Sequence, residues 1–282
     1  MKKLIALTLF LFVILLLSPA IDSPIYKQVI VNGKKVNKWL KVSEYLEYNE
    51  NGSIDYSWTS SFEKWYQYDE KENLTYQKTS IGNGLIVSSC FFEYDENNNK
   101  TYEKWSNGTE TWYDYNSRGK EAHSKSSSGD ERWNEYDTNG NLVLTRAFFK
   151  EYGITTELSF EYDKEGNLIY SKEGSNDERW YMYDENGNVI YKKVHGEEEW
   201  LEYDSDLLVH SKSSSGDEKW FIYDDNGNKT YYRFSSGEVG WYEYDAKGNR
   251  THFSNNRGDE KWFEYQYHEN GKIKSVTMYE PI

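Results

Sequence analysis

A tyrosine that is almost always followed by Asp or Asn returns about every 20 residues, and this period constrains the fold more than any other feature. We call this tyrosine the anchor and number each repeat from it as position zero. A fixed period of this length is typical of an array of structural repeats, in which each unit packs against its neighbours. With spacings of 20, 21 or 26 residues, the anchors are Tyr48, Tyr68, Tyr94, Tyr115, Tyr136, Tyr162, Tyr183, Tyr203, Tyr223, Tyr244 and Tyr265.

Aromatic residues precede the anchor in an alternating pattern. Position −3 is Trp in most repeats and position −2 is usually Tyr or Phe, as in Trp220-Phe221-Ile222-Tyr223. In an extended strand alternate side chains point to opposite faces, so the anchor and position −2 share one face and the Trp lies on the other. The chain has 11 Trp and 27 Tyr but few aliphatic residues. Because each aromatic side chain buries roughly 150–250 Å², we expect an ordered chain with an aromatic core.

Glycines mark two turns in each repeat. One Gly recurs at position +4, usually after Asn and led by Asp, and a second recurs seven residues before the next anchor. Gly adopts positive φ without steric cost, and Asp accepts the backbone N–H bonds that close a turn. No helical periodicity follows residue 20. The sequence therefore predicts an all-β fold: a tandem array of about 11 antiparallel β-hairpins, forming a long twisted meander or a spiral or solenoid sheet.

The two ends of the chain differ from the repeats. Residues 1–20 combine two lysines, an apolar run and small residues, which predicts a signal peptide and an exported product without membrane insertion after cleavage. Residues 21–44 contain Asn32-Gly33 between β-branched residues, the signal of a hairpin that would cap the open end of the array. The array itself is assigned to residues 45–265. Residues 266–282, where Gly271 comes two residues late, are expected to form a C-terminal cap.

Two repeats are longer, with extra residues around 79–87 and 146–154. Insertions in repeat proteins map to loops and often to a binding face. The alternative is a lengthened strand pair within the sheet. The second insertion carries Phe148 and Phe149, which we include among the candidate binding residues.

Composition excludes several classes of function. The net charge of −15 disfavours nucleic acid and anionic membrane surfaces, which require a basic stripe. The single cysteine, Cys90, is expected to be a small buried hydrophobe. The five histidines lack ligand spacing and differ in their repeat positions, so we predict no metal and no cofactor. No catalytic motif occurs, and the recurrent Asp fits a structural role in the turn. We therefore predict a protein that is not an enzyme.

The repeat resembles a known family. Its core in one copy reads Gly216-x-x-x-Trp220-x-x-Tyr223-Asp224-x-x-Gly227-Asn228. This pattern is similar to the YD repeat of Rhs-type polymorphic toxins and teneurins, over roughly residues 45–273. The resemblance implies successive hairpins in a long antiparallel sheet that spirals into a hollow shell. Position −3 is richer in Trp than in that pattern. A weaker resemblance links the chain to choline-binding cell-wall repeats, but their Gly-Trp pair is missing and no ligand is taken from it.

Two hypotheses of function follow from the Trp array. In the first, the protein is an exported, extracellular, cell-surface or periplasmic scaffold that binds a protein partner at the cell surface. In the second, exposed aromatic side chains stack on the sugar rings of a glycan or cell-wall polysaccharide. The candidate binding residues for either function are Trp112, Trp133, Trp180, Trp200, Trp220, Trp241, Trp262, Phe148 and Phe149.

Overall fold

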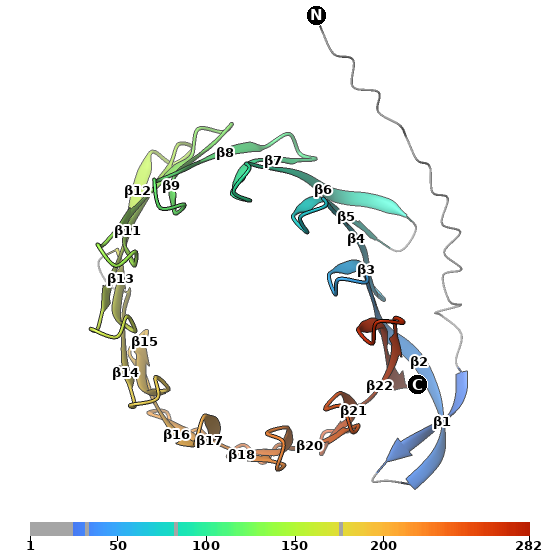
Figure 1. Cartoon of the computed structure of the whole chain (residues 1–282). Helices are drawn as coiled ribbons and strands as arrows, with labels where there is room; N and C mark the ends of the chain where they lie inside the picture. Colours follow the sequence, from blue (N-terminus) through green and yellow to red (C-terminus); the bar gives the residue numbers. More distant parts are fainter. Residues whose placement is uncertain (1–24, 32–33, 82–83, 175–176) are drawn as a thin grey trace, which may run out of the picture.

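A computed structural model describes residues 25–31, 34–81, 84–174 and 177–282 (Figure 1). Every regular element in these residues is a β-strand, which confirms the predicted all-β hairpin fold. None of the described residues belongs to a helix that is long and apolar enough to cross a membrane. The strands are β1 (Ile25–Val31), β2 (Lys34–Tyr48), β3 (Ile54–Thr59), β4 (Phe62–Tyr68), β5 (Leu74–Ile81), β6 (Leu85–Tyr94), β7 (Lys100–Trp105), β8 (Glu110–Tyr115), β9 (Glu121–Ser126), β10 (Glu131–Tyr136), β11 (Leu142–Phe149), β12 (Ile154–Tyr162), β13 (Leu168–Glu173), β14 (Asp177–Tyr183), β15 (Val189–Val194), β16 (Glu197–Asp204), β17 (Leu207–Ser213), β18 (Glu218–Tyr223), β19 (Lys229–Phe234), β20 (Val239–Tyr244), β21 (Arg250–Asn255), β22 (Glu260–Tyr267) and β23 (Ile273–Pro281).

The strands form one antiparallel sheet that closes on itself. Each strand pairs with the strands before and after it in sequence, and β23 pairs with β2, for example Thr277 with Tyr45. Strands β2 to β23 therefore make a ring of 22 strands in the described residues, seen end-on in Figure 1. The predicted hairpin meander is confirmed, whereas the alternative of a spiral or solenoid sheet is wrong. The last pairing closes the sheet, because it supplies the backbone partners that the two edges of an open sheet lack.

The anchor tyrosine links neighbouring strands. In most repeats its hydroxyl donates to a backbone carbonyl on the preceding strand, as from Tyr223 to Leu208 at 2.9 Å. In every hairpin from Tyr48 to Tyr244 the strand register shifts by one residue at the anchor, for example between Ile222 and Tyr223. Such a β-bulge bends the strand and increases its twist. A bulge repeated in every hairpin gives the sheet a recurrent bend, and a closed sheet needs curvature of this kind.

The turn after the anchor is closed by its Asp and Asn. Asp184 Oδ1 accepts hydrogen bonds from the backbone N–H groups of Asn186 and Asn188 at 2.9 and 2.8 Å, and Asn188 Nδ2 donates to Asp184 Oδ2 at 3.1 Å. Gly187 at position +4 has φ of +85°. The predicted turn chemistry is confirmed, with Glu72 and Asn98 adopting positive φ in two turns that lack the glycine.

The two ends of the described chain lie beside each other, because β2 pairs with both β1 and β23. Strand β1 pairs with the first part of β2, and this hairpin lies outside the ring in Figure 1. It covers the sheet near β22 and β23 rather than an open end, because the ring has none. The turn residues Asn32-Gly33 and the predicted signal peptide lie outside the described residues. Residues 266–282 contain the end of β22 and all of β23, the strand that closes the ring.

The last hairpin displaces its turn by two residues. Tyr265 donates its hydroxyl to the Arg250 carbonyl at 2.9 Å, as an anchor does. The bulge instead lies at Tyr267 and the turn follows it, which places Gly271 four residues after that tyrosine. The late glycine therefore reflects a longer strand β22.

The two 26-residue repeats contain longer strands. Pairing of β5 with β6 extends to Ile81 and Leu85, and pairing of β11 with β12 extends to Phe149 and Ile154. Of the two alternatives for these insertions, the lengthened strand pair is confirmed. Cys90 on β6 is fully buried as predicted, and this burial raises the pKa of its thiol to about 11.

Candidate functional site

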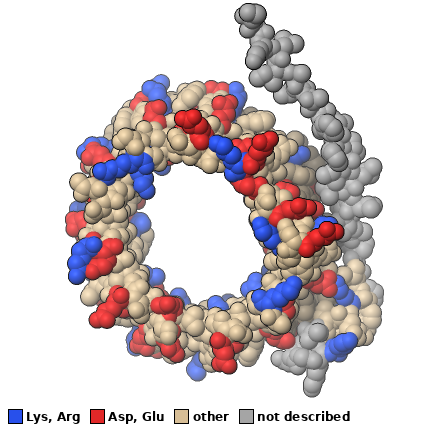
Figure 2. All heavy atoms as spheres, viewed as in Figure 1, with Lys and Arg blue, Asp and Glu red and all other residues tan. Residues whose placement is uncertain are grey.

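The two faces of the ring present different side chains. The β1–β2 hairpin lies outside the ring and buries Trp262, so position −3 points outward. By strand alternation, positions −5 and −1 also point outward, while −4 and −2 point inward. The centre of the ring is open in the space-filling view (Figure 2), so inner side chains line a hollow. The expected aromatic core is replaced by rows of ring contacts across neighbouring strands.

The outer row, which we call the aromatic belt, pairs each Trp with a ring on the preceding strand. Tyr170 and Trp180 have ring centroids 5.4 Å apart, and Lys193 Nζ on the following strand lies 5.7 Å from the Trp180 ring. Aromatic pairs of this kind contribute roughly 0.5–1.5 kcal/mol beyond their buried area. The belt consists of Tyr56–Trp65, Tyr102–Trp112, His123–Trp133, Tyr170–Trp180, Tyr191–Trp200, His210–Trp220, Tyr231–Trp241 and His252–Trp262.

Three histidines occupy one equivalent position in the belt, which corrects the expectation that histidine positions differ. His123, His210 and His252 each precede a Trp by ten residues and stack on it, with interplanar angles of 28°, 18° and 22°. Each imidazole lies between two carboxylates, as His252 does between Glu243 at 2.9 Å and Glu260 at 3.2 Å. The equivalence is seen by counting back from the Trp rather than forward from the preceding anchor. The reason is that the turn between the histidine and the Trp varies less in length than the turn after the anchor.

The candidate binding residues divide by exposure. Five belt tryptophans are open to solvent, with exposed fractions of 37–45%: Trp112, Trp133, Trp180, Trp200 and Trp241. Trp220 is half-buried, as is Phe148, whereas Phe149 at the end of β11 is 37% exposed. The belt therefore offers a discontinuous series of aromatic surfaces around the ring.

Trp262 is not an exposed platform, which corrects its place among the candidates. Only 3% of it is exposed, because Val29 and Leu40 of the N-terminal hairpin pack with it and with Tyr279. Its indole N–H is buried with no hydrogen-bond partner in the described part of the chain. Lys38 Nζ lies 4.6 Å from the indole ring.

Two lysines fasten this hairpin to the carboxylates beside Trp262. Lys38 pairs with Glu260, and Lys27 pairs with Glu264. Glu260 and Glu264 stand two residues before and after the Trp, so all three side chains share the outer face. The chain thus covers one belt position with its own aliphatic and cationic segment.

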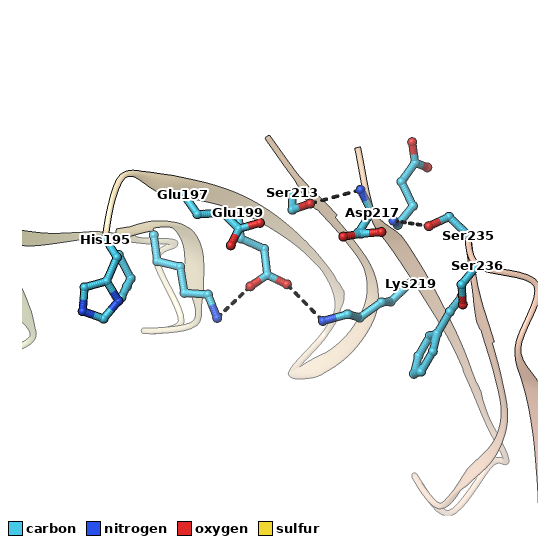
Figure 3. Close-up of a pocket in the computed structure, with 12 residues that line it drawn as sticks. His195, Glu197, Glu199, Ser213, Asp217, Lys219, Ser235 and Ser236 are labelled. Carbon is cyan, nitrogen blue, oxygen red and sulfur yellow. Dashed lines mark hydrogen bonds and ion pairs between the residues drawn. The ribbon is translucent and has the colours of Figure 1, made fainter. Parts of the chain in front are cut away.

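The inner face contains a polar groove of about 590 Å³ (Figure 3). Glu199 lies at its centre, with Lys192 Nζ at 2.7 Å and Lys219 Nζ at 3.9 Å. Burial opposes ionisation of Glu199, but hydrogen bonds from Lys192 and Ser211 and the charges of both lysines prevail and lower its pKa. The charges are already paired within the groove. We find no nucleophile and base in hydrogen-bond contact among its lining residues.

No group of three His, Cys, Asp or Glu side chains is arranged to hold a metal ion within residues 25–31, 34–81, 84–174 and 177–282. Asp69, Asp95, Asp163, Asp184, Asp224 and Asp245 each accept hydrogen bonds from the Asn of their own turn and from backbone N–H groups. These carboxylates close turns, and the arrangement assigns them no chemistry.

Comparisons with known proteins report shape alone. No protein-family model matches the chain, and no curated protein matches it. A structure of TcdB2-TccC3 without its hypervariable C-terminal region is similar, with TM-score 0.48 and 12% identity, covering 87% of this chain and 16% of that one. A second TcdB2-TccC3 structure gives TM-score 0.36 and 10% identity over 84% and 18%. A porin-like protein from Bacteroides uniformis gives TM-score 0.28 and 12% identity over 84% and 94%. At these TM-scores no function is taken from them.

Proposed function

We propose that this chain is an exported, non-catalytic scaffold whose aromatic belt binds a protein partner at the cell surface. The observation that carries this proposal is the covered belt position at Trp262, where the β1–β2 hairpin docks by its aliphatic and lysine side chains. The hairpin indicates the kind of segment that the belt accepts. Membership of the YD-repeat family belongs to the same proposal, because it rests on the repeat motif.

Three open positions repeat the pattern of the covered one. Acidic residues stand two places before and after each Trp in the sequences Glu110-x-Trp112-x-Asp114, Glu131-x-Trp133-x-Glu135 and Glu198-x-Trp200-x-Glu202, as in Glu260-x-Trp262-x-Glu264. These three tryptophans are 39–45% exposed. A partner strand with aliphatic residues flanked by lysines fits such a surface, since it supplies apolar area and opposite charge together.

One difference separates the open positions from the covered one. At Trp112 the sheet itself supplies Lys104, whose Nζ lies 2.6 Å from Glu110. At the covered position the equivalent residue is Ser254, opposite Glu260, and the hairpin supplies the lysine instead. Removal of Lys104 should therefore make the Trp112 position resemble the one that binds the hairpin.

The test uses a fluorescein-labelled peptide of residues 25–42, titrated with the whole protein and followed by fluorescence anisotropy. We expect the peptide to bind, and to bind roughly tenfold more tightly to Lys104→Ser, since a charge-assisted contact contributes about 1.5–3 kcal/mol. Adding Trp112→Ala to this variant should remove the gain.

A charge-reversed peptide with Lys27→Glu and Lys38→Glu is the matched control and should bind much more weakly. If the native peptide fails to bind both proteins, or the reversed peptide binds equally well, the aromatic belt does not dock such segments.

Glycan binding is the second candidate, favoured by the exposed rings of Trp112, Trp200 and Trp241. Acrylamide quenching of tryptophan fluorescence, with and without cell-wall and host glycans, separates the two functions. Protection of the exposed tryptophans by one glycan supports a stacking surface. Unchanged quenching with every glycan leaves the protein partner as the function.

A further inference from the structure

A second surface, on the inner face, is independent of the proposed function. The residue six places after the anchor begins the second strand of most hairpins, and in three hairpins it is a cation that lies against position −2 rings. Lys100 Nζ is 5.8 Å from the Phe92 ring and 4.3 Å from the Tyr113 ring. Because position −2 points inward, these cations line the hollow, where Figure 2 shows Lys and Arg side chains along the central opening.

Lys229 and Arg250 occupy the same position in two consecutive hairpins. Lys229 Nζ lies 5.3 Å from the Phe221 ring and 5.2 Å from the Tyr242 ring. Arg250 Cζ lies 5.7 Å from the same Tyr242 ring and 4.3 Å from the Phe263 ring. The two cations and three rings therefore alternate along the inner face of β18 to β22.

The three equivalent cations differ in their acidic partner. Lys100 pairs with Glu103, three residues later, at 2.8 Å. The residues three places after Lys229 and Arg250 are Tyr232 and Phe253, so neither cation has the corresponding carboxylate. No other carboxylate forms an ion pair with Lys229 or Arg250 in the described residues.

The electrostatic consequence is opposite at the two places. Burial lowers the pKa of Lys100, but the hydrogen bonds from its Nζ to Glu103 and Tyr113 outweigh this and raise it overall. Burial, followed by the nearby charge of Arg250, lowers the pKa of Lys229. A carboxylate beside Lys229 would relieve this effect, since an opposite charge favours the charged form of lysine.

The surrounding rings are held in place. Tyr232 is 5% exposed and its ring lies over Gly240, where an added Cβ would meet the ring at 2.2 Å. Its ring centroid is 6.0 Å from that of Tyr242, which is 5.1 Å from that of Phe253. These rings pack on one another, and Phe263 is only 8% exposed. They offer little open ring face for a sugar, so the cations are the groups that remain for a ligand.

We propose that Lys229 and Arg250 form a carboxylate-binding site on the inner face for an acidic peptide segment. Its aspartate or glutamate side chains take the place that Glu103 fills beside Lys100. The internal example is itself a glutamate side chain, which favours a peptide over other anions. The net charge of −15 opposes the approach of this ligand at long range, so the attraction is local and falls with added salt.

The first test measures the fluorescence anisotropy of a fluorescein-labelled oligoglutamate peptide with the whole protein at low ionic strength. We expect the native protein to bind it. The double variant Lys229→Gln with Arg250→Gln should bind roughly tenfold more weakly or worse, because two charge-assisted contacts are lost. The control with the same change of charge, Lys164→Gln with Lys120→Gln, alters exposed turn residues and should bind like the native protein.

A second pair of variants keeps the test valid if the double variant unfolds. Phe253→Glu places a carboxylate three residues after Arg250, as Glu103 follows Lys100. This internal carboxylate should occupy the site and weaken peptide binding roughly tenfold relative to Phe253→Gln, which matches it in size without the charge. Thermal melts of each variant identify any loss of folding.

Several outcomes would overturn the proposal. These are no binding by the native protein, equal binding by the Lys229/Arg250 variant, equal loss in the Lys164/Lys120 control, or equal binding by Phe253→Glu and Phe253→Gln. Polygalacturonate serves as the other polyanion. If it binds through Lys229 and Arg250 and the oligoglutamate peptide does not, the ligand is an acidic polysaccharide and the peptide assignment is wrong.

Discussion

At the scale of single residues, the turn after each anchor shows how a short motif directs the chain. Asp184 receives hydrogen bonds from two backbone N–H groups and from Asn188, and Gly187 takes the left-handed conformation that follows. A residue with a Cβ in that conformation costs roughly 1–2 kcal/mol. The motif therefore acts through backbone geometry, and its repetition gives most of the hairpins the same turn.

Gly187→Ala tests this geometry in isolation. No atom lies within 4 Å of the added Cβ, so the cost is conformational. We expect the free energy of unfolding to fall by about 1 kcal/mol. Chemical denaturation measures it, with Glu185→Ala in the same turn as the control that should change little. Equal stability of the two variants would contradict a left-handed requirement.

The turn aspartates make stability depend on pH. Hydrogen bonds from Asn188, first from its side chain and then from its backbone, lower the pKa of Asp184 below the ordinary value of 3.8. A carboxyl group whose pKa is lowered in the folded state stabilises the fold. This stabilisation is fully present above the ordinary pKa and is lost as the pH falls through the folded-state pKa. Native protein should therefore exceed Asp184→Asn in stability at neutral pH, and the difference should shrink on acidification. Denaturation midpoints across this range check the sign, and a difference that grows at low pH would refute it.

At the scale of elements, the N-terminal hairpin shows how one strand pair comes to lie on others. Leu40 is fully buried and Val29 is 8% exposed, whereas five tryptophans of the aromatic belt remain open to solvent. The sequence of the hairpin predicts two strands but not the surface on which they pack. That surface is decided by Trp262, Tyr279 and the flanking carboxylates, which lie more than 200 residues away along the chain.

Leu40→Ala should destabilise the protein strongly, because it removes a fully buried side chain from this cluster. We expect a loss of roughly 2–5 kcal/mol in the free energy of unfolding. Ile222→Ala is the control, since Ile222 is 56% exposed on the outer face and its loss should cost about 0.5 kcal/mol or less. Chemical denaturation of both variants gives the comparison. Similar small losses in both would show that the hairpin does not depend on this cluster.

At the scale of the whole molecule, closure removes the free edges of the 22-stranded ring. Strand β2 pairs with β3 on one side and with β23 on the other. In the described residues, every strand of the ring therefore has a neighbouring strand on both sides. Unpaired edges are templates for association with other chains. Closure therefore leaves the ring itself without such a template, and in the part of the chain that the structure describes only β1, outside the ring, pairs on one side alone.

Deleting residues 273–282 should reopen the ring. Both β22 and β2 would then expose backbone groups that β23 now satisfies. We expect concentration-dependent association, measured by size-exclusion chromatography with light scattering. Deletion of Ile282 alone, which lies beyond β23 and is 68% exposed, is the control and should leave the size unchanged. A truncated chain that stays monomeric would contradict the role of closure.

The sequence by itself determined the local structure of this protein. The period, the −3 and −2 aromatics and the Asp-Asn-Gly turn predict antiparallel hairpins, because strand alternation and turn geometry are local properties. It also pointed to the tryptophans as an aligned row. The equivalence of His123, His210 and His252 was present in the sequence as well, but is seen only when repeats are aligned on the Trp.

Only the tertiary structure decided that the sheet closes, which side chains point inward or outward, and which of them are buried. Pairing of β23 with β2 depends on the accumulated bend of many hairpins, which no single repeat encodes. Trp262 and Trp200 occur in the same pattern, yet one is buried and the other exposed, because a hairpin from the far end of the chain covers only the first. Long-range contacts of this kind have no local signature.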